Sequence, residues 1–281
     1  MRKNLFIIFF VIPTIVLGQN TILWKVTDKE NRHTSYLLGT YHLLDRTFVD
    51  SFPIIAEKLK ACDMVLTEVE KDSSRIRSYY NKRASSDQVN KILAPGDIDL
   101  INRILTYSTV KDINKLTPGE LFAKLSGYYD AFCLGLTDTK MRMDEYIQFL
   151  AKENRKQQIY FESDTLQIEL LRKGTAQIDW NFFKKNIKPL LDKYKQPNPT
   201  ISSNSLYRKY VTFDLNYSFD DACGGEVLVE KRNDEWMTKI PALFKDNNCF
   251  MAVGLLHYFK NCGIITQLRQ LGFKVEPILL Q

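Results

Sequence analysis

The sequence predicts an α/β protein with a mostly parallel sheet, helices on both faces, an opening β-hairpin and a helical insertion in the middle. Three observations support this fold class. Short apolar runs such as "MVLTEV" and "CFMAVG" alternate with longer amphipathic segments. Near the amino terminus, an apolar run, a helical segment and a second apolar run follow one another, as in a βαβ unit. Residues from about 73 to 156 have a mostly helical composition.

The first 18 residues have the pattern of a secretory signal peptide. Arg2 and Lys3 precede the apolar run "LFIIFFVIPTIVLG", which ends at Gly18, a small residue suited to a cleavage site. A membrane anchor is the rival interpretation, but a spanning helix needs about 20 apolar residues, whereas this run is shorter and contains Pro13. We therefore expect a mature chain of residues 19–281 that is secreted or periplasmic, with no stable membrane insertion.

The first elements of the mature chain predict a hairpin and then a βαβ unit. The runs "ILWKVTD" and "HTSYLLGT" flank "KEN", which is typical of a β-hairpin. The segment "DSFPIIAEKLKAC" places Pro53 in a first helical turn and apolar residues on one face, so it predicts a helix. The next run, "DMVLTEVE", predicts a strand that lies parallel to the strand before the helix.

The later elements alternate in the same way. A helix in "MDEYIQFLAKENRK" leads into a strand in "QQIYFE", and helices follow in "TLQIELLRKG", "WNFFKKNIKPLLDKYK" and "EKRNDEWMTKIPALFKD". The chain closes with a strand in "CFMAVG", a helix in "GIITQLRQLG" and a strand in "FKVEPILL". No low-complexity tract or linker divides the chain, so we expect residues 19–281 to form a single domain.

Composition argues against several classes of function. The formal charge of +6 falls to +4 without Arg2 and Lys3, and the basic residues are scattered, so we expect no nucleic-acid partner. The five cysteines include no CxxC pair, which argues against a zinc knuckle or a redox pair. Cys62 and Cys249 lie in apolar segments, where we interpret them as small buried hydrophobes.

Four predicted strands end at a residue type that binds metals or transfers protons. "YLLGT" is followed by His42 and "CFMAVG" by His257, so each strand leads into a G-x-x-H motif. Glu68 lies near the end of "DMVLTEVE", and Glu162 ends "QQIYFE". Ligands of open α/β sheets gather outside the carboxyl ends of the strands. These four side chains are therefore expected to converge on one site.

Each of the four residues also has a purely structural interpretation. A lone histidine after a strand is more often a hydrogen-bonded ring than a ligand, and Glu68 can simply mark where a strand meets water. Two of the chain's three histidines and two glutamates at matching positions favour a shared site instead. Imidazole and carboxylate ligands suit a divalent manganese, cobalt or zinc ion, and one glutamate could act as a general base.

These motifs resemble the TraB/PrgY/GumN family, which includes the Tiki metalloproteases, over nearly the whole mature chain. "YLLGTYHLLD" and "ACDMVLTEVE" are similar to its first block, and "EKRNDEWMTKI" is similar to its Arg-Asn helix. The central and closing blocks resemble "MDEYIQFLAKENRKQQIYFESDTLQ" and "FMAVGLLHYFKNCGIITQLRQLGFKVEPI". The glycine usual before the central glutamate is replaced by Phe161. We interpret Asp144 as the N-cap of the following helix.

The resemblance implies the α/β fold shared with ChaN-like haem-uptake proteins and erythromycin esterases, and hydrolysis of peptides with a divalent metal. It implies that His42 and His257 bind the metal or act in catalysis, with Glu68 and Glu162 beside them. It also implies that Arg232 binds a substrate carboxylate or a developing oxyanion. Without the resemblance, Arg232 would be interpreted as a charge on the surface of a helix.

The leading interpretation is an exported divalent-metal-dependent hydrolase, a peptidase, acting on a peptide or protein substrate. The expected metal ligands are His42, His257, Glu68 and Glu162, and the expected catalytic residues are Glu68, Glu162 and Arg232. The alternative is a non-catalytic peptide-, haem- or metal-binding protein on the same fold, in which Tyr41 beside His42 could ligate haem iron. A third interpretation is an inactive relative whose glutamates only orient the histidines.

Overall fold

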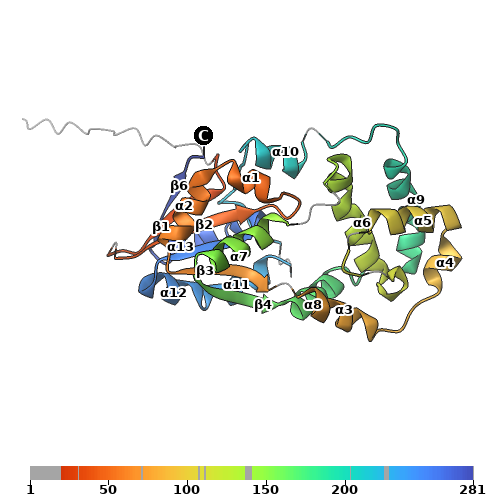
Figure 1. Cartoon of the computed structure of the whole chain (residues 1–281), viewed down its shortest axis with the longest axis horizontal. Helices are drawn as coiled ribbons and strands as arrows, with labels where there is room; N and C mark the ends of the chain where they lie inside the picture. Colours follow the sequence, from red (N-terminus) through yellow and green to blue (C-terminus); the bar gives the residue numbers. More distant parts are fainter. Residues whose placement is uncertain are drawn as a thin grey trace, which may run out of the picture.

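The computed structural model of the chain describes residues 20–30, 32–70, 72–106, 108–110, 112–136, 141–202, 204–224 and 228–280. The predicted signal peptide, residues 1–18, lies outside these described residues. The described chain forms an α/β lobe built on one sheet and a helical lobe beside it (Figure 1). None of the helices in these ranges is both long enough and apolar enough to cross a membrane.

In the described ranges, six strands form one sheet in the order β4-β3-β5-β2-β1-β6. The strands are β1 (Leu23–Thr27), β2 (Thr34–Thr40), β3 (Met64–Glu70), β4 (Gln157–Ser163), β5 (Cys249–Gly254) and β6 (Lys274–Ile278). Strands β2 to β5 run parallel to one another, whereas β1 pairs antiparallel with both β2 and β6. The mostly parallel sheet and the opening β1–β2 hairpin confirm the predicted fold class.

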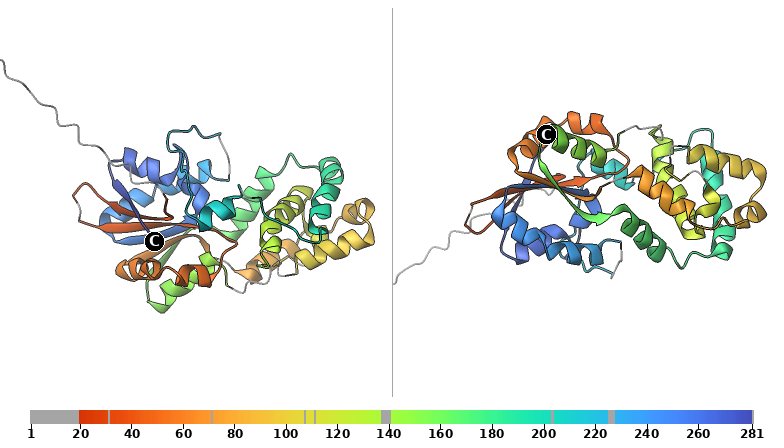
Figure 2. Two further views of the ribbon diagram at one scale, coloured as in Figure 1. Left: turned by 90° about the horizontal axis from the view of Figure 1, so that it is seen from above. Right: turned by 60° about the horizontal axis from the view of Figure 1, so that its bottom comes forward.

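Helices cover both faces of the sheet, as predicted (Figure 2). One face carries α1 (Arg46–Asp50), α2 (Pro53–Ala61) and α7 (Met143–Glu153), and the other carries α11 (Glu230–Met237), α12 (Ile240–Asp246) and α13 (Ile264–Gln270). Every residue of the inner strand β5 is buried. Its continuous apolar run "CFMAVG" is typical of a parallel strand that is covered on both sides.

The helical lobe has an apolar core of its own. Its helices are α3 (Ser73–Asn81), α4 (Gln88–Ile92), α5 (Pro95–Ile104), α6 (Pro118–Cys133), α8 (Asp164–Gly174) and α9 (Trp180–Tyr194), with the short 3-10 helix η1 (Ile113–Lys115). Ile101, Leu121, Phe183 and Leu191 are fully buried in this second core. The predicted helical insertion lies before β4, and two helices that follow β4, α8 and α9, join it in the same lobe. Helix α9 packs directly against α6.

The register of the parallel strands brings their carboxyl ends together. Strand β5 lies between β2 and β3, with Thr40 opposite Gly254 and Thr67 opposite Ala252. On the far side of β3, Val69 lies opposite Glu162 of β4. The four strands end at the edge of the sheet that faces the helical lobe (Figure 1). Segments that are far apart in the sequence therefore lie side by side at this edge.

Two further segments and the cysteines complete the α/β lobe. The chain forms α10 (Leu206–Val211) before α11, and the 3-10 helix η2 (Leu255–Tyr258) directly after β5. Cys223 and Cys262 form a disulfide. Cys62 and Cys249 are buried free thiols in the core, which confirms their interpretation as small hydrophobes.

Candidate functional site

A cleft of about 860 Å³ lies between the carboxyl ends of the strands and the helical lobe. Its wall on the α/β lobe includes His42, Glu68 and Arg232. Its wall on the helical lobe includes Tyr80 and Lys124, and apolar residues line the space between the two walls. The cleft thus opens at the edge of the sheet where the sequence predicts a site.

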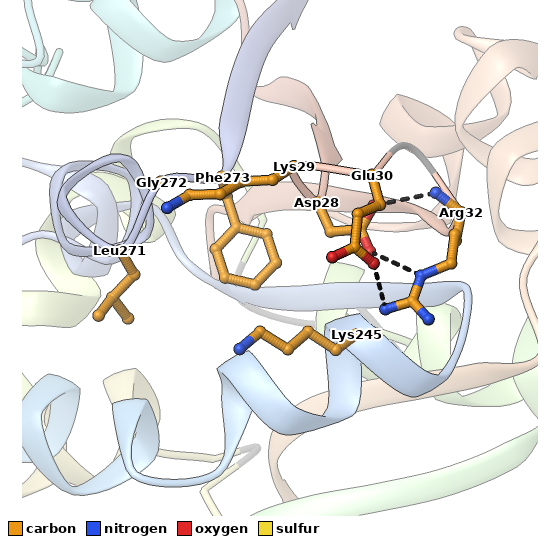
Figure 3. A pocket seen from close by; sticks show the side chains of 8 residues that line it. All are labelled: Asp28, Lys29, Glu30, Arg32, Lys245, Leu271, Gly272 and Phe273. Carbon is orange, nitrogen blue, oxygen red and sulfur yellow. Dashed lines mark hydrogen bonds and ion pairs between the residues drawn. The ribbon is translucent and has the colours of Figure 1, made fainter.

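A smaller cavity of about 220 Å³ lies beside the turn between β1 and β2, at the opposite end of the sheet (Figure 3). The charged groups on one side of this cavity bind one another. Arg32 forms an ion pair of 2.6 Å with Glu30, and its backbone N–H donates a 2.9 Å hydrogen bond to Asp28. Because these groups already have partners and the cavity has no histidine in its lining, we assign the larger cleft as the candidate site.

His42 follows β2, and its ring is held by Asp144. One carboxylate oxygen of Asp144 lies 2.6 Å from Nδ1 of His42, and the other accepts a 2.6 Å hydrogen bond from the Thr40 hydroxyl. A carboxylate only accepts, so Nδ1 carries a proton, and in the neutral ring Nε2 then carries the lone pair. The predicted N-cap role of Asp144 is wrong. The N-cap of α7 is Arg142, and Asp144 reaches from the first helical turn back to the end of β2.

His257 lies in η2 and is buried against Trp236, with 4.4 Å between the ring centroids. Its Nδ1 lies 2.6 Å from Oδ1 of Asn233. The Asn233 amide nitrogen donates to the carbonyl oxygens of His257 and Cys262, so the amide oxygen must face the ring. Nδ1 of His257 therefore donates, and Nε2 again carries the lone pair. Burial lowers the pKa of His257 to about 4, so the ring is neutral at pH 7.

Glu68 lies next to both histidines. Its Oε1 accepts a 2.6 Å hydrogen bond from the Gly254 N–H and lies 3.8 Å from Nε2 of His257. A Cβ atom at position 254 would lie 3.1 Å from this Oε1 and 3.2 Å from Nε2 of His42, so glycine keeps the space between them open. Burial acts to raise the pKa of Glu68, but the neighbouring imidazoles and guanidinium lower it to about 2. Glu68 is therefore ionised at neutral pH.

Arg232 of α11 joins the two glutamates. Its Nε and Nη2 donate to the two carboxylate oxygens of Glu162 at 2.7 and 3.0 Å, and Nη2 also donates to Glu68 at 2.6 Å. Its Nη1 lies 3.2 Å from Nε2 of His257. Glu162 also accepts a 2.9 Å hydrogen bond from the indole of Trp236, which stacks beneath the guanidinium. Burial acts to lower the pKa of Arg232, but the bonds to Glu162 and Glu68 raise it.

The structure brings the five predicted site residues together at the sheet edge, but it does not place their ligand atoms in a tight cluster. His42, Glu68 and Arg232 line the cleft, whereas Glu162 and His257 lie behind this wall in contact with Arg232. In the described part of the chain, the histidines and glutamates of the site do not place three ligand atoms within 4.8 Å of one another. One set of three does meet this criterion among the described residues, Cys223, Glu230 and Cys262, but its two sulfur atoms form the disulfide.

The donor types and charges at the sheet edge nevertheless fit a divalent cation. Three carboxylates lie at this edge: Glu68 and Glu162 bind the guanidinium of Arg232, and Asp144 binds His42, so two negative charges remain when all three are ionised and both imidazoles are neutral. In the neutral rings, Nε2 of each histidine carries the lone pair, and that of His257 lies 3.2 Å from Nη1 of Arg232. Glu162 does not line the cleft and its oxygens accept hydrogen bonds from Arg232 and Trp236, whereas Glu68 lines the cleft and lies beside both histidines. His42, Glu68 and His257 are therefore the better candidate ligands.

The comparison with known proteins identifies the family. A sequence model of the TraB/PrgY/gumN family matches residues 22–277, from just before β1 into β6. The chain belongs to the TraB/PrgY/gumN family. The match includes every site residue described above and both lobes, so this family assignment covers the whole cleft. None of the curated proteins compared with the chain gives a significant match.

Sequence reasoning assigned no site role to two residues that shape the site. Asn233 is fully buried and orients His257, and Gln167 of α8 donates a 3.2 Å hydrogen bond to Glu68. Asn233 directly follows Arg232 in "EKRNDEW", so its position next to a predicted site residue is the signal in the sequence that could have indicated a role in the site. For Gln167 the only signal is its position five residues after Glu162. The contacts of Asn233 with His257 and of Gln167 with Glu68 could not be predicted without the fold.

We predict that the metal-free protein loses stability as the pH falls from 6.5 to about 4. The pKa of His257 is about 4 in the fold against an ordinary value of 6.5, so the unfolded chain binds the proton first and unfolding becomes more favourable. The loss corresponds to about 3 kcal/mol in the free energy of unfolding. Thermal unfolding over a pH series measures it.

A matched pair of variants tests the origin of this pH dependence. His257→Gln should flatten the fall between pH 6.5 and 4, because glutamine does not titrate. His33→Gln, which changes the histidine beside β2 on the opposite end of the sheet, should leave the fall unchanged. An equal fall in wild type and His257→Gln would show that another group causes it.

Proposed function

We propose that this protein is an exported hydrolase of peptides or proteins, secreted or periplasmic, that uses a divalent manganese, cobalt or zinc ion held by His42, Glu68 and His257. The main support is the matched orientation of the two histidines. In each, Nδ1 is bound at 2.6 Å by an acceptor from a helix that packs on the sheet, Asp144 in one case and Asn233 in the other. Such acceptors behind the ring are typical of metal-binding histidines.

The residues around this ligand set then have separate roles. A bound divalent ion would lower the pKa of a water molecule to about 7 and polarise the substrate carbonyl. Arg232 lies on the same wall of the cleft, and Nη1 could donate to a carbonyl oxygen that gains negative charge if it leaves the Leu228 carbonyl oxygen or Nε2 of His257. Glu162 holds the guanidinium with both oxygens, so we assign it to positioning Arg232.

The low pKa of Glu68, about 2, makes it a weak proton acceptor. We therefore assign Glu68 to binding the ion, where a permanently ionised carboxylate is an advantage, and not to general-base catalysis. Gly254 supports this role in two ways, because its N–H orients Oε1 of Glu68 and its missing side chain leaves room beside His42.

The cleft fits a peptide better than a small planar ligand. It is long enough to contact both lobes, and Ile76, Ile168, Leu171 and Leu228 give it apolar surface beside the polar wall. Haem ligation by Tyr41 has no support in the geometry, because Tyr41 packs against Tyr207 and Tyr210 and does not line the cleft. Non-catalytic binding of a peptide or a metal is therefore the alternative that experiments should test.

We predict that the mature protein binds about one equivalent of manganese, cobalt or zinc and hydrolyses peptides only with the ion bound. His42→Ala and His257→Ala should each abolish tight binding and turnover, because each removes one imidazole ligand. Elemental analysis and titration calorimetry measure the ion, and mass spectrometry of a peptide mixture measures cleavage.

His33→Ala is the control, since it removes the third histidine of the chain without touching the cleft. Full activity in metal-free protein or in both cleft variants would contradict the proposal. Tight metal binding without any cleavage would support a metal carrier instead.

We also predict that Asp144→Asn weakens metal binding by roughly tenfold to a hundredfold, because the ring of His42 loses its charged acceptor. Calorimetry on folded protein gives the ratio of dissociation constants. Asp179→Asn is the matched control. Asp179 caps α9 in the helical lobe, and asparagine caps a helix equally well. Equal affinities in wild type and Asp144→Asn would contradict the assigned role of Asp144.

A further inference from the structure

Lys124 of α6 faces the cleft from the helical lobe, across from the wall that holds His42 and Arg232. The other charged side chains that line the cleft are bound within the protein. Their contacts are His42 with Asp144, Glu68 with Arg232, Asp164 with Arg75, Glu145 with the backbone N–H of Arg142, and Arg142 with the carbonyl oxygen of Leu43. Among the charged lining residues in the described ranges, Lys124 alone has no hydrogen bond or ion pair.

The nearest acid cannot serve as a full partner for Lys124. Glu120 lies one helical turn earlier on α6 and is fully buried. It forms an ion pair of 2.7 Å with Arg83, and it closes the capping box at the start of α6 by accepting from the Thr117 N–H at 2.8 Å. Burial lowers the pKa of Lys124, and the charge of Glu120 only opposes this change. The Lys124 ammonium is thus a partly buried cation without a hydrogen-bonded anion.

The surroundings of Lys124 indicate which ligand would complete it. Tyr128 follows one turn later on the same helix, and Val110, Ile168 and Leu171 add apolar surface to the same lining. A cation held against apolar groups is costly until an anion binds it, and the bound pair is then stronger than it would be in water. A mainly apolar peptide with a carboxylate would pair with the Lys124 ammonium and pack against the apolar lining.

We propose that Lys124 binds a carboxylate of the substrate and so selects the peptides that enter the cleft. This inference rests on the proposed function, because it takes the cleft to be the substrate site. The carboxylate could be the free carboxyl terminus of a peptide or the side chain of an aspartate or glutamate. In both cases, the helical lobe recognises the substrate while the α/β lobe holds the reacting bond.

Three synthetic peptides separate the possibilities. All share one apolar hexapeptide sequence with an acetylated amino terminus. The first has a free carboxyl terminus, the second is amidated and neutral, and the third is amidated with one internal glutamate. Dissociation constants are measured with wild type, Lys124→Met, Lys124→Gln, Lys124→Arg and Lys185→Met, and cleavage is followed in parallel. Lys185 is an exposed lysine of α9 outside the cleft and serves as the charge-matched control.

Wild type should bind at least one carboxylate peptide roughly tenfold or more tightly than the neutral peptide, as expected for a hydrogen bond to a charged group. Both neutral variants should lose this preference, whereas Lys124→Arg and Lys185→Met should keep it. Tighter binding of the first peptide assigns a terminal carboxylate, and tighter binding of the third assigns an acidic side chain.

The two proposals fail in different ways. No carboxylate preference in wild type, or an unchanged preference in folded Lys124→Met and Lys124→Gln, would overturn the role of Lys124 even if cleavage proceeds. A preference that depends on Lys124 without any cleavage would support this role and would contradict only the proposed hydrolase activity.

Discussion

The ion pairs between Arg232 and the two buried glutamates hold the candidate site together. Removing charges from water costs several kcal/mol each, and close pairing with further hydrogen bonds is needed to offset that cost. Arg232 supplies three such bonds from α11, on one face of the sheet, to the ends of β3 and β4. This contact fixes α11 against the sheet edge, and the same helix then brings Trp236 and Asn233 to His257.

The sheet edge could be predicted from the sequence, whereas the partners within it could not. Short apolar strands that end in histidine or glutamate must converge when the strands are parallel, so His42, Glu68, Glu162 and His257 followed from pattern alone. The roles of Glu162 and Asp144 depend on contacts across the fold. Glu162 meets Arg232 about 70 positions later in the chain, and Asp144 meets His42 about 100 positions earlier. An aspartate near the start of a helix is typical of an N-cap, so the sequence predicts this role for Asp144 and not its contact with His42.

The helical lobe shows a second limit of sequence reasoning. Composition predicted that residues from about 73 to 156 are mostly helical, and α8 and α9 were predicted individually, but neither kind of signal says which apolar faces meet. Helices α8 and α9 follow β4 in the chain and still pack with α3 to α6, around a core separate from that of the sheet. This packing of α8 against the earlier helices forms one side of the cleft, because α8 places Gln167 and Ile168 beside the strand ends. The wall that contains Lys124 is therefore a product of tertiary packing.

The two histidines of the G-x-x-H motifs differ in a way that their matching sequences hide. His257 is buried beside Arg232, where an imidazolium would repel the guanidinium, and its acceptor is the neutral amide of Asn233. His42 is exposed on the cleft wall, with 61% of its side chain accessible, and its acceptor is the charged carboxylate of Asp144. A neutral acceptor suits the buried ring because it adds no bias toward protonation. A charged acceptor suits the exposed ring because it holds a fixed tautomer against competition from water. His257 is thus a buried, closely packed part of the site, whereas His42 is accessible to an ion or a substrate in the cleft.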